Sequence, residues 1–165
     1  QYKIIEGTPI ILGIEEGADI LKRIADEIEK LELGGSTYKV ESVQMNALRG
    51  ELGACRENRH YKFLTHWLAL NPGNYERYKE MRDWRARKEF LNGILVGNIL
   101  SMCKSLDYVV DRKLYVHSRV DAERVEYKGI PVMGFTGEFR VNFKIPDFFG
   151  LGKGVSQGFG VVKRK

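Results

Sequence analysis

The alternation of side chains between Met133 and Ile145 constrains the fold of this chain more than any other part of its sequence. Large apolar residues recur there at odd positions, and polar or charged residues recur at even positions. Because the side chains of a strand point alternately to its two faces, the pattern predicts a strand with one face in a core and one wet, cationic face. The core set is Met133, Phe135, Phe139, Val141, Phe143 and Ile145, and the wet set is Arg140, Asn142 and Lys144.

A long amphipathic helix is the second strong signal. From about Ala86 to Ser105, apolar residues recur in steps of three and four, which is the period of a helix with one buried face. Gly93 and Gly97 lie one turn apart on this helix, so we expect another element to approach it closely. The residues predicted to face the core are Phe90, Leu91, Ile94, Leu95, Ile99, Met102 and Leu106.

Weaker patterns divide the rest of the chain into short strands and helices. The chain contains two consecutive groups of strands and helices, with strands in the majority in each. This order predicts an α+β fold of tandem ferredoxin-like domains, which we place at residues 1–58 and 59–165. Residues 46–58 read as a connection or a second hairpin. Further helices are predicted at 20–31, with an Asp26–Lys30 pair, and at 75–84. Strands are predicted at 2–5, 9–14, 37–43, 61–67 and 159–162, and two or three strands over 113–120, 124–132 and 133–145.

Charge and cysteine content narrow the function. The chain has 27 Lys and Arg against 22 Asp and Glu, and residues 152–165 carry four of these basic residues and no acid, which favours an anionic partner. Cys55 and Cys103 fit no zinc, redox or disulfide pattern, so we expect a reducing cytoplasm. No apolar run approaches the roughly eighteen residues of a membrane helix. The chain opens at Gln1 without a methionine, and we expect a further segment upstream.

A glycine-rich segment near the C-terminus is the most informative motif. It spans residues 150–160 and reads GLGKGVSQGFG, with five glycines, a lysine and a serine between two predicted strands. Glycines let backbone amides approach a phosphate, and lysine adds a charge, so the segment predicts phosphate binding or, alternatively, a sharp structural turn. It matches neither a Walker loop nor a dinucleotide fingerprint. The residues proposed to contact the phosphates are Gly150, Gly152, Lys153, Gly154, Ser156, Gln157, Gly158 and Gly160.

Two basic surfaces outside this segment are further candidates. The run from Arg77 to Lys88 is rich in Lys and Arg, and we select Arg85, Arg87 and Lys88 as contacts for an anionic partner, with a solvated helix face as the alternative. Tyr115, His117 and Arg119 share one face of a predicted strand, which suits stacking and phosphate neutralisation but also fits an ordinary wet sheet face.

The three histidines are weak catalytic candidates. His60 precedes the aromatic strand, His66 lies between Thr65 and Trp67, and His117 lies on the face just described. For each of them a structural or solvated role competes with a catalytic one. The sequence has no HExxH, no CxxC and no carboxylates spaced for magnesium, so we predict no metal and no cofactor.

Several segments together resemble a known family. The string Ile145-Pro146-Asp147-Phe148-Phe149 followed by the glycine-rich segment is similar to the signature of the Cas-six family, RAMP-type endoribonucleases that process CRISPR repeat RNA. The segments FLNGILVGNILSMCK (residues 90–104), YKFLTHWLALN (61–71) and YKIIEGTPIILGIEEGADIL (2–21) resemble the b-type branch of that family. The chain departs from many members at Gly154, Gln157 and Val161, where they carry Ser, Arg and Thr, and at His66, where the branch usually has Pro.

The resemblance implies an activity and its partners. It implies metal-independent attack of an RNA 2′-hydroxyl on the adjacent phosphate, with CRISPR repeat RNA as substrate, and it places the family's catalytic histidines upstream of Gln1. Other CRISPR effector subunits, a homodimer and a cytoplasmic location without a membrane anchor are expected as well. Two alternatives stay open: a non-catalytic subunit that retains guide RNA, and a small-molecule phosphate-binding enzyme, which would need a concave apolar pocket beside the glycine-rich segment and no extended basic groove.

Overall fold

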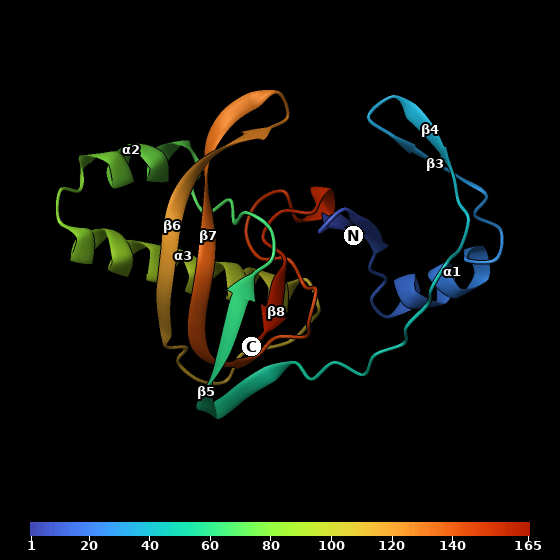
Figure 1. The fold of residues 1–165 in the computed structure, drawn as a ribbon. Coiled ribbons are helices and arrows are strands. Elements are labelled where there is room, and N and C mark those ends of the chain that lie inside the picture. The colour runs from blue at the N-terminus through green and yellow to red at the C-terminus, as the bar shows by residue number, and fades with distance from the viewer.

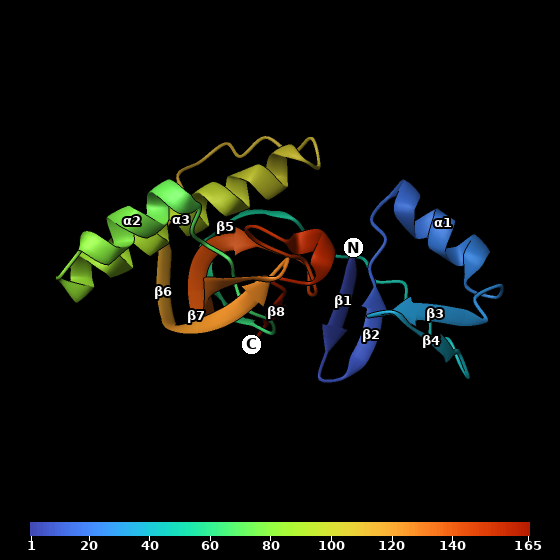
Figure 2. The same cartoon turned by 90° about the horizontal axis from the view of Figure 1, so that it is seen from above.

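An open four-stranded antiparallel sheet with helices on one face forms the larger part of the molecule (Figures 1 and 2). The computed structural model describes residues 1–165, except for the side chain of Leu33. The spatial order of the strands is β6-β7-β5-β8. Their bounds are β5 Gly53–Phe63, β6 Val116–Tyr127, β7 Ile130–Lys144 and β8 Val162–Arg164, and the helices are α2 Pro72–Glu80 and α3 Trp84–Lys104.

This strand order is that of a ferredoxin-like domain. The helices α2 and α3 cross from β5 to β6, the hairpin β6–β7 returns, and β7 comes to lie beside β5. The second crossover, which is a helix in the usual pattern, is here the glycine-rich segment with a single 3₁₀ turn, η1 Val155–Gln157. The chain then ends on β8, which pairs with the outer edge of β5. The α+β class is therefore confirmed.

The core lies between α3 and the sheet, and it uses the predicted residues of α3 except Phe90, whose half-buried ring lies under Arg77 instead. Leu91, Leu95 and Ile99 of α3 are buried together with the odd-numbered apolar side chains of β7. Phe139 stacks on Tyr61 at 5.4 Å between ring centroids, and the two rings are almost fully buried. The alternation along β7 is thus confirmed, with one exception on the wet side: Asn142 is buried.

Asn142 is buried because it satisfies backbone groups at the start of β6. Its Oδ1 accepts a hydrogen bond from the Tyr115 amide at 2.7 Å, and its Nδ2 donates to the Lys113 carbonyl at 3.0 Å. Both bonds fix the approach of residues 113–115 to β7. Asn142 therefore has a structural role.

Residues 1–51 lie to one side of this sheet, beyond the glycine-rich segment (Figure 1). They form a hairpin, a helix and a second hairpin: β1 Tyr2–Ile5 with β2 Thr8–Ile11, α1 Glu16–Ile24, and β3 Lys30–Leu33 with β4 Ser36–Lys39. Strand β1 contacts η1. None of the nine residues of α1, all of which are described, is buried.

The predicted helix 20–31 is wrong in its second half. It ends at Ile24, and Lys30–Leu33 is a strand. The reason lies in Gly34 and Gly35, whose φ angles of 58° and 81° suit the two-residue turn of a hairpin, so the following residues pull the segment into a strand pair. The predicted Asp26–Lys30 helix pair is lost with that half, and the strand expected at 37–43 becomes the shorter β4.

Of the two or three strands predicted between Lys113 and Ile145, two are present, and their bounds differ from the predicted ones. β6 continues unbroken past Glu123, and the turn comes at Lys128-Gly129, both with positive φ. The region 46–58, predicted as a connection or hairpin, contains the start of β5 at Gly53. Helix α2 begins earlier than expected, at Pro72 behind the Asn71 cap, and β8 replaces the strand predicted at 159–162.

The glycines of α3 do not serve a close contact. No other described atom lies within 4 Å of the position that a Cβ would take at Gly93 or Gly97, so the predicted approach of another element is wrong for the residues that the structure describes. Among the described helices, none is both long enough and apolar enough to cross a membrane.

Candidate nucleic-acid interface

The sheet face opposite α3 is covered by basic side chains. We call it the basic sheet face. Strand register brings its residues into two rows across the sheet: His117, Arg140, His60 and Lys165 form one row, and Arg119, Glu138, Lys62 and Lys163 form the next. Helices α2 and α3 lie behind the sheet in Figure 1, so this face stays open. All of these side chains are exposed except His60 and Glu138, which are half-buried.

The charge of this face is strongly positive. Five of its eight residues are Lys or Arg, and Glu138 is its one carboxylate. Glu138 accepts a hydrogen bond from Lys165 Nζ at 2.7 Å and lies 3.2 Å from His60 Nε2. The hydrogen bond from Lys165 lowers the pKa of Glu138, so the carboxylate stays charged and holds its basic neighbours in place. Four further cations remain to attract the phosphates of a nucleic acid.

Two of the three histidines are brought together by the strand register. His60 on β5 and His117 on β6 both pair with Arg140 on β7, one from each side. Neighbouring strands lie about 5 Å apart, so the three side chains form a compact row of two imidazoles around a guanidinium. Sequence reasoning placed His117 beside Arg119 but missed this row, because the pairing of β5 with β7 is not visible in the sequence.

His66 lies apart from the other two histidines. Its Nε2 donates to Glu123 Oε2 at 2.8 Å, and Thr136 Oγ1 donates to the other oxygen of that carboxylate, also at 2.8 Å. The hydrogen bond with His66, and then the one with Thr136, lowers the pKa of Glu123. His66 is therefore held by a hydrogen bond to Glu123 beside the β6–β7 hairpin.

Tyr115 lies just before β6, next to the basic sheet face. Its ring is half exposed, and Lys113 Nζ lies 5.5 Å from the ring centroid. The predicted grouping of Tyr115 with His117 and Arg119 thus places an aromatic ring at the edge of the basic surface.

The glycine-rich segment is a tightly packed turn whose glycines have packing reasons. A Cβ at Gly152 would lie 2.8 Å from Trp67 Nε1, and a Cβ at Gly160 would collide with the Leu151 carbonyl. Gly154 and Gly158 flank η1 in the left-handed region, and Gly150 is buried and bridges to Val161. Six amides between residues 151 and 160 donate to carbonyls of the chain itself. The packing therefore explains these glycines as residues that a sharp structural turn requires, which was the alternative to phosphate binding.

Three side chains of the segment face solvent, namely Lys153, Ser156 and Gln157. Lys153 Nζ lies 5.4 Å from the centroid of the Tyr127 ring, and the Lys153 amide donates to the Leu68 carbonyl at 3.2 Å. The backbone of Lys153 is thus fixed while its amine stays accessible. These three residues are what the segment offers to a ligand.

The basic run on α2 and α3 lies on the helix side of the sheet, away from the basic sheet face (Figure 2). Arg87 donates from Nε to the Met81 carbonyl at 2.7 Å and lies over the Tyr78 ring, so it is partly committed to packing. Arg85 lies over the exposed Trp84 ring, and Lys88 is half-buried. The predicted contacts Arg85, Arg87 and Lys88 therefore belong to a separate surface.

No three side chains of His, Cys, Asp or Glu come together as metal ligands among the residues that the structure describes.

Comparison with known proteins identifies the family. Residues 53–165 match the model of the Cas6b C-terminal domain, and residues 1–51 match that of the Cas6b N-terminal domain. The chain belongs to the Cas6b family. An uncharacterized protein of Methanocaldococcus jannaschii is 46% identical over 139 residues, which are 83% of this chain and 93% of the relative.

The two family models meet near residue 52, whereas the division predicted at 58 and 59 falls inside β5. The domain boundary therefore stays a prediction.

Two solved Cas6b structures resemble the whole chain. One, described as Cas6b, has a TM-score of 0.94 and 39% identity, and the match covers 100% of this chain and 76% of that one. The other, described as a CRISPR RNA processing endoribonuclease Cas6b, has a TM-score of 0.83 and 36% identity, with 100% and 80% covered. These likenesses support the predicted tandem ferredoxin-like fold.

Proposed function

We propose that this protein binds CRISPR repeat RNA across its basic sheet face and cleaves it into guide RNAs. Membership of the Cas6b family supports the RNA class, since a relative of 36% identity over the whole chain is described as a CRISPR RNA processing endoribonuclease. The observation that carries the proposal is the open sheet face with five Lys and Arg side chains in register. Such a surface suits a polyanion that lies across several strands.

The proposed reaction is attack of an RNA 2′-hydroxyl on the neighbouring phosphate, without a metal. This reaction needs a general base, a general acid and positive charge near the phosphate oxygens, and each proton-transfer group contributes about a hundred- to ten-thousandfold. His60, Arg140 and His117 offer those three kinds of group in one row. His66 is less suited, because it lies outside this row, beside Glu123.

Cleavage of a labelled CRISPR repeat RNA in EDTA tests the activity. We expect a product with a cyclic phosphate and a partner with a free 5′-hydroxyl, because attack by the 2′-hydroxyl leaves these ends. Binding without cleavage would favour the second candidate, a non-catalytic subunit that retains guide RNA. Cleavage that stops in EDTA and returns with Mg²⁺ would contradict the metal-independent reaction.

The histidine row has its own test. The double variant His60→Asn, His117→Asn keeps polar side chains at both positions, and His66→Asn is the matched control away from the row. If the row transfers protons, cleavage falls at least about a hundredfold while affinity for RNA changes little. Unchanged cleavage would assign the acid and base to other groups and leave the row with RNA binding alone.

Assembly with other CRISPR effector subunits and a homodimer remain predictions. Light scattering with and without repeat RNA tests the dimer: a mass that doubles at one RNA per two chains would support it.

A further inference from the structure

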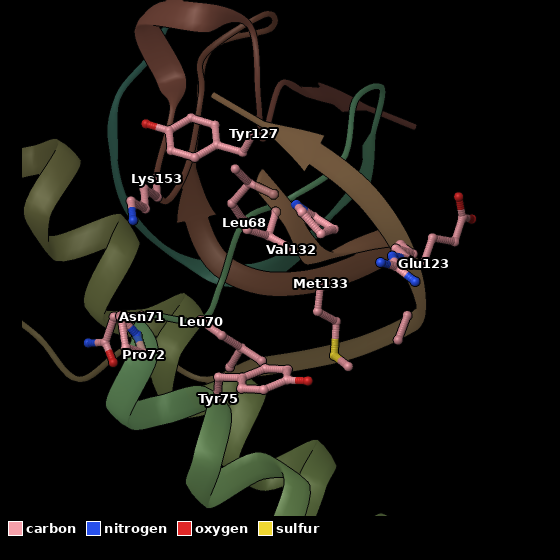
Figure 3. Close-up of a pocket in the computed structure, with 13 residues that line it drawn as sticks. Leu68, Leu70, Asn71, Pro72, Tyr75, Glu123, Tyr127, Val132, Met133 and Lys153 are labelled. Atoms are coloured by element: carbon pink, nitrogen blue, oxygen red, sulfur yellow. The ribbon is translucent and has the colours of Figure 1, made fainter. Parts of the chain in front are cut away.

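A cleft opens between the β6–β7 hairpin and the start of α2, beside the glycine-rich segment (Figure 3). Its volume is about 630 Å³. Apolar side chains from three elements form its walls, among them Leu68, Leu70, Val132 and Met133. The β6–β7 hairpin curls over these walls, and the cleft opens to solvent.

Aromatic and charged groups are placed around the mouth of this cleft. Figure 3 shows Tyr127 and Tyr75 at opposite sides, Lys153 on one flank and Glu123 on another. Lys153 is held by its backbone, because its amide donates to the Leu68 carbonyl and the preceding Gly152 packs on the Trp67 indole. Arg124 adds a second cation to the lining.

The acidic group of the cleft is already engaged. Glu123 accepts hydrogen bonds from His66 Nε2 and Thr136 Oγ1, both at 2.8 Å, so its two carboxylate oxygens are engaged within the protein. The lining carries two cations, Lys153 and Arg124, against this one carboxylate, so the cleft favours an anionic ligand. An anionic ligand with an aromatic part fits apolar walls, two tyrosine rings and two cations.

We propose that this cleft binds one nucleotide of the RNA, turned out of the strand, with its base between the apolar walls and Tyr75 and its phosphate at Lys153. The proposal rests on the proposed function, which supplies the RNA. The volume lies in the range of small-molecule sites, roughly 300–1,000 Å³, and accommodates a single nucleotide. Proteins that recognise single-stranded RNA commonly hold splayed bases on aromatic side chains.

Strand β6 connects the cleft to the basic sheet face. His117 and Arg119 belong to that face, whereas Ala122 and Arg124, a few residues further along the same strand, have the opposite parity and line the cleft on the other side of β6. Because β6 is an edge strand of the sheet, an RNA strand that leaves the basic sheet face around this edge would reach the cleft with the next nucleotides. The cleft would then add base recognition to a surface that otherwise contacts phosphates only.

A filled cleft tests the proposal. Ala122 is exposed and lines the cleft, so Ala122→Trp places an indole in the space that the base would take. The control is Ile130→Trp, which puts the same ring at the exposed end of the hairpin, outside the cleft. Affinity is measured for a single-stranded repeat RNA and for a series of the same RNA with one abasic site at each position in turn. Melting curves of each variant check the fold.

The expected result is one position at which loss of the base weakens binding to the wild type about tenfold, the size of one base stacked on an aromatic ring. Ala122→Trp should weaken binding of the intact RNA by a similar factor and make the abasic site at that position neutral, whereas Ile130→Trp should behave as wild type. Tyr75→Ala, on the surface of α2, should reproduce the effect if Ala122→Trp does not fold.

The outcomes separate the cleft from the proposed function. If the wild type binds RNA and no abasic position is coupled to the cleft variants, the cleft proposal is wrong and RNA binding stands. If the wild type does not bind RNA at all, the proposed function fails. A last experiment measures binding of the four nucleoside 5′-monophosphates, those of adenosine, guanosine, cytidine and uridine. If one of them binds tightly and RNA does not displace it, the cleft is a small-molecule site and the proposal is wrong.

Discussion

The two faces of the four-stranded sheet differ completely, although the same strands build both. Phe139 on β7 is 1% exposed and packs beneath α3, whereas the next residue, Arg140, is exposed between His60 and His117. The apolar face stabilises the domain, and the basic face contributes almost nothing to burial. Substitutions one residue apart should therefore separate stability from RNA binding, which makes this pair of faces directly testable.

The largest effect is expected on the apolar face. Phe139→Ala removes a ring that stacks on Tyr61 and packs at a tilt against Phe63, so it should lower the free energy of unfolding by about 3–5 kcal/mol. Chemical denaturation followed by circular dichroism measures this. Arg140→Ala is the matched control and should stay within about 0.5 kcal/mol of the wild type. Equal destabilisation by the two variants would show that the basic face is also structural.

The glycine-rich segment provides the second test, because it belongs to the packed side of the comparison. Gly152 has a φ of 89°, and a side chain there would meet the Trp67 indole, so Gly152→Val should cost about 2–3 kcal/mol of stability. Denaturation followed by tryptophan fluorescence measures it. Lys153→Ala should leave stability unchanged and weaken RNA binding modestly, since the exposed amine contributes little to the fold. A stable Gly152→Val protein would contradict the packing account.

The basic face should give a smaller and purely electrostatic effect. If about five phosphates are neutralised, the slope of log affinity against log salt is near −3.5 for a single strand, and Arg140→Ala should reduce its magnitude by about 0.7 while weakening binding several-fold. Titrations at several salt concentrations measure both quantities. Affinity that does not change with salt would show that the basic sheet face is not the RNA surface.

Much of this fold could be predicted because its signals are local. The alternation along β7 and the period of α3 each lie within one element, and both are confirmed. The predictions failed where local patterns compete: Ile28 and Leu31 continue a helical spacing, yet the Gly34-Gly35 turn directs Leu31 into a strand. Lys128-Gly129 lacks the usual Asn-Gly signal of a tight hairpin, so the long β6–β7 pair was divided at the wrong place.

The candidate site was less predictable because it depends on pairing between distant strands. His60 and His117 are 57 residues apart in the sequence and meet only through Arg140. The cleft likewise joins Tyr75, Tyr127 and Lys153 from three separate segments. The glycine-rich segment stands out in the sequence, but its residues could not reveal that Trp67 and Leu151 account for two of its glycines.

The smallest effect is expected at Lys3, which differs from the lysines of the basic sheet face because it is buried instead of exposed. It lies on β1 with 0% exposure, its Nζ donates to Gln1 Oε1 at 2.7 Å, and burial lowers its pKa to about 8. In the unfolded chain the pKa of a lysine is near 10.4, so between about pH 8 and 10.4 the unfolded state binds more protons than the folded state. Stability must therefore rise with pH across this window.

We expect the melting temperature of the wild type, relative to that of Lys3→Met, to increase by a few degrees at most from pH 7.5 to pH 10. The control is Lys62→Met, which removes an exposed lysine and should leave the pH dependence of the wild type unchanged. A difference between wild type and Lys3→Met that is constant with pH would show that Lys3 keeps an ordinary proton affinity and that β1 does not bury its charge against the glycine-rich segment.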